Sequence, residues 1–361
     1  LLSQPKLMRK AIRDELEAVR EKYADARRTQ IIDASDKKVV TASDLLPDEQ
    51  VWVLVGEKGT IGRTTSPDMV NIPLKPPELP AALLEANTQD ALYLFAADGR
   101  AVCLPVYQLP QSRELGKGTH WTDLTGFSRR DHLAAALVVP SVAEGYLFLT
   151  TLTGTVKRLR LEDLPGLTTD RFTVINVSDD DALGWAALTS GSDEVLLSTA
   201  AGQTIRFAEE EVRPMGLPAG GVYGIKLANE ADGLIGMDLA AAGDLVWSIT
   251  DDGLAKATPL DEYPVQGRYG QGVINMRLPD GSEEIAAVVV GNEKTRIIVK
   301  TALGSAKKLR LNKTYMGSRA VKPRAIFKVS KRNRIVGALS LTERPQFDED
   351  EAAPEQLSLL A

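Results

Sequence analysis

Leu92-Tyr93-Leu94-Phe95-Ala96-Ala97-Asp98-Gly99-Arg100-Ala101-Val102 joins two apolar runs through an Asp-Gly pair. Such a pair between apolar runs is a strong signal for a tight β-hairpin. The same arrangement, an apolar run that meets a turn glycine, occurs six times, at Gly59, Gly99, Gly154, Gly202, Gly253 and Gly304. These glycines are 40, 55, 48, 51 and 51 residues apart, and a period in this range is typical of a propeller or a solenoid.

Each repeat unit holds enough strand-like sequence for about four short strands. In the fourth and fifth units the later strands include residues 222–227 and 273–278. A unit of this size cannot bury both faces by itself, so the units must stack radially or close into a ring. We therefore predict an all-β, propeller-like domain. The sequence leaves open whether its disc is closed, flat or spiral.

Basic residues follow the turn glycines at a recurring place. They lie three or four positions after five of the glycines, as Arg63, Lys157 with Arg158, Arg206, Lys256, and Lys307 with Lys308, while Arg100 follows Gly99 directly. A basic residue at a similar place in every unit would give a ring of such units positive charge at regular intervals.

Composition sets the class of protein. The chain of 361 residues is 43% apolar, which is ordinary for a globular protein with a sizeable core. It has no run of 18 apolar residues, so we expect no membrane span. Its single cysteine, Cys103, excludes an intrachain disulfide and a Cys-rich zinc site and fits a buried role in a cytoplasmic protein. The start at Leu1, without a methionine, predicts a fragment of a longer protein.

The net charge of −6 hides a sharp partition along the chain. Residues 294–334 contain 14 Lys and Arg and no Asp or Glu, residues 1–293 carry −15, and the residues from 343 to the end carry −5. A basic segment of this kind predicts a polyanionic partner in spite of the acidic total, although a solvated basic face balanced by acidic loops is the plainer alternative.

The two ends of the chain differ from the repeats. Met8, Ile12, Leu16, Val19 and Tyr23 recur at helical spacing, which predicts one helix within residues 1–30 whose apolar face packs on something else. The β-domain then covers residues 37–342. Residues 343–361 are acidic and lack a pattern, so we predict a disordered tail. This tail would either compete with a polyanion for the basic segment or serve solubility alone.

Several stretches resemble the C-terminal domain of bacterial type IIA topoisomerase A subunits, the family that includes the A subunits of DNA gyrase and of topoisomerase IV. The blade-like stretches are residues 92–102 with 106–110, 212–216 with 221–227, and 262–264 with 272–274. Residues 15–29, which end in Arg27-Arg28-Thr29, resemble the helix from the end of the coiled-coil region that precedes this domain. The resemblance covers nearly the whole chain.

This resemblance implies a six-bladed β-pinwheel, preceded by one helix, whose basic rim binds and wraps double-stranded DNA. It also implies that the fragment is non-catalytic and needs no cofactor, because the cleavage tyrosine, the metal-binding carboxylates and the ATPase of the family lie outside this domain. The implied partners are the rest of the A subunit together with an ATPase B subunit, in a heterotetramer that uses ATP and Mg²⁺.

One feature departs from the family. In gyrase the first blade carries a motif, Gln-basic-Arg-Gly-Gly-basic-Gly, which is needed for wrapping, and residues 68–80 of this chain show no trace of it. The fifth unit has a partial match over residues 266–272, Gln-Gly-Arg-Tyr-Gly-Gln-Gly, and residues 112–118 a weaker one. The fifth-unit motif is either a displaced DNA-binding loop or a blade-closing turn that needs glycine for positive φ. A topoisomerase IV-like domain that holds DNA without chiral wrapping is therefore an alternative.

Wrapping requires cations along a convex rim that neutralise successive phosphates. The predicted DNA-binding residues are Arg63, Arg100, Lys157, Arg158, Arg160, Arg206, Lys256, Gln266, Arg268, Lys307, Lys308, Arg310, Lys313, Arg319, Lys322 and Arg324. The last unit, which also contains Lys328, looks dominant.

Other chemistry is weakly indicated. His120 and His132 have no Cys or His partner at ligand spacing, and residues 56–59 lack the Gly-Lys-Ser/Thr end of a P-loop. A propeller that binds an acidic protein partner remains an alternative function. A propeller enzyme with a site in the central channel is the other, but it would need polar inner strands, and the runs that we expect to be innermost, residues 53–55 and 297–299, are apolar.

Overall fold

The computed structural model describes residues 4–23, 48–65, 79–112, 117–292, 295–309, 313–326 and 328–341. The chain divides into two compact units, Leu1–Leu45 and Leu46–Ala361. The first contains helix α1 (Pro5–Tyr23), where the helical spacing predicted one, and its apolar side chains Met8, Ile12, Leu16, Val19 and Tyr23 are exposed. The predicted acidic tail, residues 343–361, lies outside the described residues.

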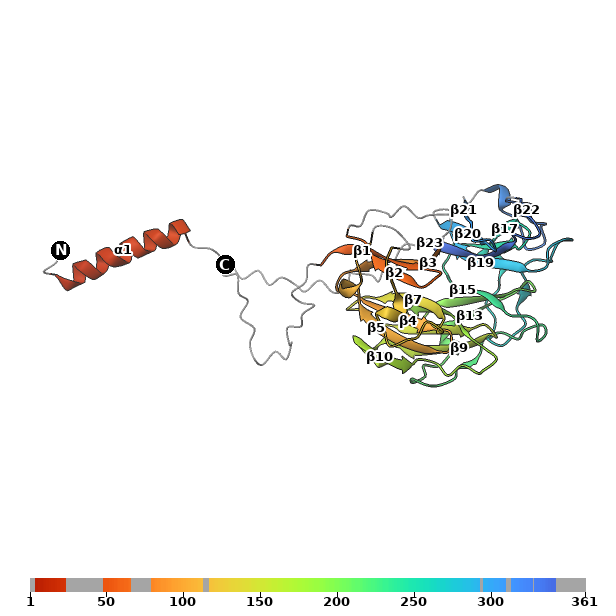
Figure 1. Ribbon diagram of the computed structural model, residues 1–361, viewed down its shortest axis with the longest axis horizontal. Helices are drawn as coiled ribbons and strands as arrows, with labels where there is room; N and C mark the ends of the chain where they lie inside the picture. Colours follow the sequence, from red (N-terminus) through yellow and green to blue (C-terminus); the bar gives the residue numbers. More distant parts are fainter. Residues whose placement is uncertain are drawn as a thin grey trace. The chain divides into compact units, whose positions relative to one another are not determined.

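The second unit consists of six antiparallel sheets, called blades 1 to 6 here (Figure 1). This arrangement confirms the predicted all-β, six-bladed propeller. From inside to outside the strands are, in blade 1, β3 (Pro80–Asn87), β1 (Gln50–Gly56), β2 (Thr60–Arg63) and β6 (Thr119–His120); in blade 2, β7 (Leu133–Val139), β4 (Ala91–Ala96), β5 (Arg100–Pro105) and β10 (Thr168–Thr173); and in blade 3, β11 (Leu183–Thr189), β8 (Tyr146–Thr151), β9 (Thr155–Arg160) and β14 (Val222–Tyr223).

The other three blades repeat this plan. Blade 4 contains β15 (Leu234–Ala240), β12 (Glu194–Thr199), β13 (Gln203–Ala208) and β18 (Val273–Ile274); blade 5 contains β19 (Ile285–Gly291), β16 (Leu245–Thr250), β17 (Leu254–Pro259) and β22 (Arg324–Ala325); and blade 6 contains β23 (Ile335–Leu341), β20 (Arg296–Thr301) and β21 (Ala306–Leu309). Within the described part of the chain, blade 6 therefore has no fourth strand.

The inner strands close into a ring. Strands β3, β7, β11, β15, β19 and β23 contact one another in this order, and β23 contacts β3. The Lys300 ammonium of blade 6 also lies 2.6 Å from a Glu57 carboxylate oxygen of blade 1. The apolar runs at residues 53–55 and 297–299 belong to β1 and β20, which are second strands. The expectation that these runs are innermost was wrong, so their apolarity says nothing about the channel.

Each outer strand is donated by the unit that follows in sequence. Strand β14, for example, lies between the β12–β13 hairpin and the inner strand of blade 4, yet it pairs with β9 of blade 3 through Val222–Val156 and Tyr223–Thr155. The same exchange places β6, β10, β18 and β22 on blades 1, 2, 4 and 5. The third strand of these blades is therefore covered by backbone from the next unit.

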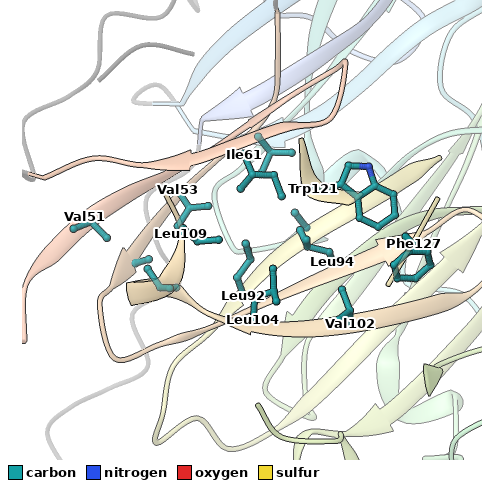
Figure 2. Packing of buried hydrophobic residues seen from close by; sticks show 14 of the residues in the cluster. Val51, Val53, Ile61, Leu92, Leu94, Val102, Leu104, Leu109, Trp121 and Phe127 are labelled. Atoms are coloured by element: carbon teal, nitrogen blue, oxygen red, sulfur yellow. The ribbon is translucent and has the colours of Figure 1, made fainter. Parts of the chain in front are cut away.

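The core lies between neighbouring blades rather than within one. Between blades 1 and 2, Val53 and Ile61 meet Leu92 and Leu94 and are closed off by Trp121 (Figure 2). Similar clusters join each later pair of blades, and Ile298 packs with Leu79 between blades 6 and 1. Because second strands are buried on both faces, they read as continuous apolar runs.

The hairpin turns require glycine, as the repeat predicted. All six turn glycines have positive φ, and Gly99 is typical, with φ of +82°. A Cβ atom on Gly99 would lie 2.1 Å from the carbonyl oxygen of Ile175, so backbone packing excludes any side chain there.

Candidate nucleic-acid interface

Of the three lysines that lie three positions after a turn glycine, Lys157 and Lys256 are buried and Lys307 is exposed. Lys157 on β9 has no exposed surface, and its Nζ donates to the Val174 carbonyl at 2.6 Å. Lys256 on β17 is 1% exposed and donates to the Arg319 carbonyl. Burial lowers the pKa of each ammonium from 10.5 to about 8. Because both side chains are buried and bonded to backbone carbonyls of other segments, they cannot reach a phosphate, and their assignment to DNA binding is corrected.

Arginines four positions after the turn glycines bind the protein instead. The Arg158 side chain is 8% exposed, lies 3.4 Å from a Glu209 carboxylate oxygen and stacks on Tyr146, so its assignment is corrected too. Arg206 bonds Glu194 at 2.6 Å and donates to the carbonyls of Leu260 and Tyr263.

Two further predicted cations are engaged in the same way. Half-buried Arg63 donates to the carbonyls of Thr64 and Tyr107 at 3.4 Å. Arg100 lies 2.6 Å from both Asp98 and Asp131. Most of the basic residues that follow the turn glycines therefore form hydrogen bonds or ion pairs within the protein, several of them between units.

Glu209 is the partner that the sequence did not reveal. It begins the 3-10 helix Glu209–Glu211 and has no exposed surface. Its carboxylate accepts from Thr189 Oγ1 at 2.7 Å and from the backbone N–H groups of Gly191 and Asp193 at 2.7 and 2.9 Å, besides facing Arg158. Within the run Glu209-Glu210-Glu211 only the first residue is buried.

The fifth-unit motif forms a loop that connects blades. Gln266 is half-buried, and its N–H donates to the Arg206 carbonyl at 2.8 Å. Arg268 donates from Nη1 to the Tyr223 carbonyl at 3.2 Å and from Nε to the Glu211 carbonyl at 3.1 Å. A Cβ on Gly272, whose φ is +68°, would lie 2.3 Å from the Thr204 carbonyl oxygen. These contacts account for the arginine and the last glycine of the motif as parts of a blade-closing turn.

Arg319 repeats the role of Arg268 one blade later. Its N–H donates to Glu262 Oε2 at 2.8 Å, and its Nη1 donates to the Ile274 carbonyl at 3.2 Å. Arg319 also lines a cavity of about 740 Å³ together with Arg277 and Lys322 and the acids Glu262 and Asp280.

Exposed cations remain at the outer part of the blades. Arg160 is exposed and lies 3.4 Å from Glu162. Other predicted cations that are exposed are Lys307, Lys308, Lys322, Arg324 and Lys328. Lys313 begins the 3-10 helix Lys313–Tyr315, and Arg310 lies outside the described residues. The predicted basic last unit thus presents several cations to solvent.

Two exposed cations at matching positions in successive units, Lys226 and Arg277, are not among the residues predicted from sequence. Lys226 and Arg277 each lie three positions after the last residue of an outer strand, β14 and β18, and both are exposed. The signal was present in the likeness of Ile225-Lys226-Leu227 to Met276-Arg277-Leu278. Their recurrence marks the outer edge of successive blades.

Among the described residues, no three His, Cys, Asp or Glu side chains are grouped so that they could hold a metal ion. No described helix is long and apolar enough to cross a membrane.

Comparison with known proteins identifies the fold and its relatives. The family model for the DNA gyrase C-terminal domain, β-propeller, matches residues 145–170, 193–241 and 248–292. The A subunit of DNA gyrase from Salmonella typhimurium is 29% identical over 94% of this chain and 39% of its own length, and that from Mycolicibacterium smegmatis is 28% identical over 98% and 42%. The chain thus spans about two fifths of these relatives.

Solved structures agree. The C-terminal domain of DNA topoisomerase IV matches with a TM-score of 0.71 and 25% identity, over 82% of this chain and 94% of that one. The DNA gyrase A C-terminal domain matches in fold with a TM-score of 0.65 and 16% identity, over 81% and 99%. In sequence and in fold the chain is therefore similar to the C-terminal β-propeller domains of gyrase and topoisomerase IV A subunits.

Proposed function

We propose that this domain binds double-stranded DNA along the outer edge of its blades and bends it. The observation that carries the proposal is the recurrence of exposed cations at that edge, with Lys226 and Arg277 in the same register and Lys307, Lys308 and Arg324 in the last two blades. Cations at regular intervals on a convex surface neutralise successive phosphates without reading bases.

Bending sets a minimum number of contacts. Smooth bending of a 20–30 bp site costs roughly 1–6 kcal/mol, so several phosphates must be contacted at once. Because the cations at 157, 158 and 256 are buried, these contacts must come from the exposed set, in which we include Arg160 and Lys322.

We further propose that the domain is the non-catalytic, DNA-holding part of a longer A subunit. Its partners would be the rest of that subunit together with an ATPase B subunit in a heterotetramer, which would work on DNA in the bacterial cytoplasm. ATP and Mg²⁺ would be needed by the whole enzyme and not by this domain. The relatives, which are named as A subunits of DNA gyrase, support this assignment.

Chiral wrapping separates the gyrase-like role from the topoisomerase IV-like role. The test is ligation of singly nicked plasmid with increasing amounts of the protein, followed by measurement of linking number after deproteinisation. A protein-dependent shift supports gyrase-like wrapping, and binding without a shift supports a platform that holds DNA. Absence of binding at low salt contradicts the proposed function.

A further inference from the structure

Two tyrosines form a stacked pair in solvent at the outer edge of blades 3 and 4. The ring centroids of Tyr223 and Tyr269 are 5.2 Å apart with an interplanar angle of 24°, and the residues are 59% and 50% exposed. Stacking holds the two rings together without burying them. Aromatic faces left in water are favourable binding surfaces for another molecule.

The backbone of Tyr269 is held in an unfavourable conformation. Its φ is +63°, and it is the sole non-glycine residue in the described ranges with positive φ. For a bulky side chain this region is a genuine outlier, and such outliers concentrate at functional sites. Two hydrogen bonds fix it there, from the Tyr269 N–H to the Gly224 carbonyl at 2.7 Å and from the Lys226 N–H to the Gly270 carbonyl at 2.9 Å.

Arg268 fixes the other half of the pair. Its guanidinium spans from the Glu211 carbonyl to the Tyr223 carbonyl, at 3.1 and 3.2 Å, while its own N–H donates to Glu211 Oε2 at 2.7 Å. The loop of Tyr269 is thereby tied to the strand of Tyr223 on both sides. The two rings are positioned before any ligand arrives, which reduces the ordering cost of binding.

The surroundings of the pair favour a polyanion. Lys226, three residues after Tyr223 and bonded through its backbone to the Tyr269 loop, is exposed. The carboxylate of Glu211, which contacts this loop, already accepts a hydrogen bond from the Arg268 N–H. Ile274, which occupies the place of Tyr223 in the next outer strand, is also 45% exposed. The edge that carries the cations thus also carries apolar side chains at matching positions.

We propose that the Tyr223–Tyr269 pair inserts into the minor groove of the bound DNA and packs against its deoxyribose rings and base edges. This inference rests on the proposed function. DNA bent around a protein turns its minor groove inward once per helical turn, and apolar side chains placed there stabilise the bend. The tyrosines would supply a non-ionic contact at a fixed point, between cations that hold the flanking phosphates.

The test is the double variant Y223S/Y269N in the full chain. Asparagine tolerates positive φ, so the backbone of the loop is retained while both rings are removed. The matched control is V142A, which trims an 87% exposed apolar residue between β7 and β8, away from the outer-strand loops. Affinity for a duplex of about 40 bp is measured by fluorescence anisotropy over a range of salt concentrations.

We expect the double variant to bind about tenfold more weakly than the parent chain, with an unchanged slope of log K against log salt and no loss of thermal stability, because the contact is non-ionic. Netropsin, which fills the minor groove, should weaken the parent chain and leave the double variant unaffected. Equal affinities of parent and variant would overturn the inference while the proposed function stands. In that case the exposed tyrosine pair would be assigned to binding a protein partner instead of DNA. No binding by the parent chain at low salt would overturn both.

Discussion

Replacing Lys226 and Arg277 together with alanine tests whether the recurring exposed cations are the DNA contacts. Each phosphate contact contributes about 0.9 to the slope of log K against log salt, so losing two contacts lowers the slope by about 1.8. At 0.1 M salt each contact is worth about eightfold in affinity, and the pair about 60-fold. Both side chains are exposed, so the fold should not change.

The matched control removes the two buried cations. Lys157→Met and Lys256→Met each delete an ammonium that bonds a protein carbonyl. These variants should keep the parent slope, whatever their effect on stability. Fluorescence anisotropy with one duplex between 50 and 300 mM KCl measures all slopes, and thermal melts confirm folding. An unchanged slope in the exposed-cation variant, or a reduced slope in the buried-cation variants, would refute this assignment of the interface.

Further predictions concern stability and the tail. Glu209→Ala should destabilise the domain by about 3–5 kcal/mol in denaturant unfolding, since it removes the carboxylate that faces the buried Arg158 guanidinium and accepts from two backbone N–H groups, and Glu209→Gln should cost less. Gly272→Ala should cost about 1–3 kcal/mol, whereas Gly216→Ala, whose Cβ would meet nothing within 4 Å, should be nearly neutral. The pKa values of Lys157 and Lys256 are lowered to about 8, so the unfolded chain binds more protons between pH 8 and 10. Stability relative to the double methionine variant should therefore rise in that interval by about 2 kcal/mol per lysine, and a fall would contradict the burial of charge. Deleting residues 343–361 should tighten DNA binding at low salt, and unchanged affinity would leave the tail a solubility role.

The repeat, the strand content and the turn glycines could be predicted from sequence because they are local. Gly99 needs positive φ for its hairpin whichever blade lies next to it. Whether a basic side chain is buried or exposed, in contrast, depends on contacts between segments that are distant in sequence. Nothing near Lys157 shows that β14, some 65 residues later, covers its strand. Adjacent Glu209 and Glu210 likewise differ completely in burial although they look like one solvated acidic run.

The residues of the candidate DNA interface could not be predicted from sequence for the same reason. The predicted basic residues recur after a visible glycine, yet at Arg63, Arg158 and Arg206 this recurrence reflects contacts that tie one unit to the next. Arg206 and Arg268 satisfy carbonyls of neighbouring segments and so resemble ligand-binding cations only in sequence. Lys226 lies within residues 222–227, which the sequence predicted as a strand, whereas in the structure β14 ends at Tyr223 and Lys226 follows it as an exposed residue.

The donation of outer strands has a mechanical consequence. Pulling the β12–β13 hairpin out of blade 4 also withdraws the segment that carries β14, so blade 3 loses its edge at the same moment. No blade from the second to the sixth can detach without damaging the one before it. Under force applied across Leu46–Ala361, the domain should therefore rupture in a single event, and DNA held under tension on its edge would load all blades together.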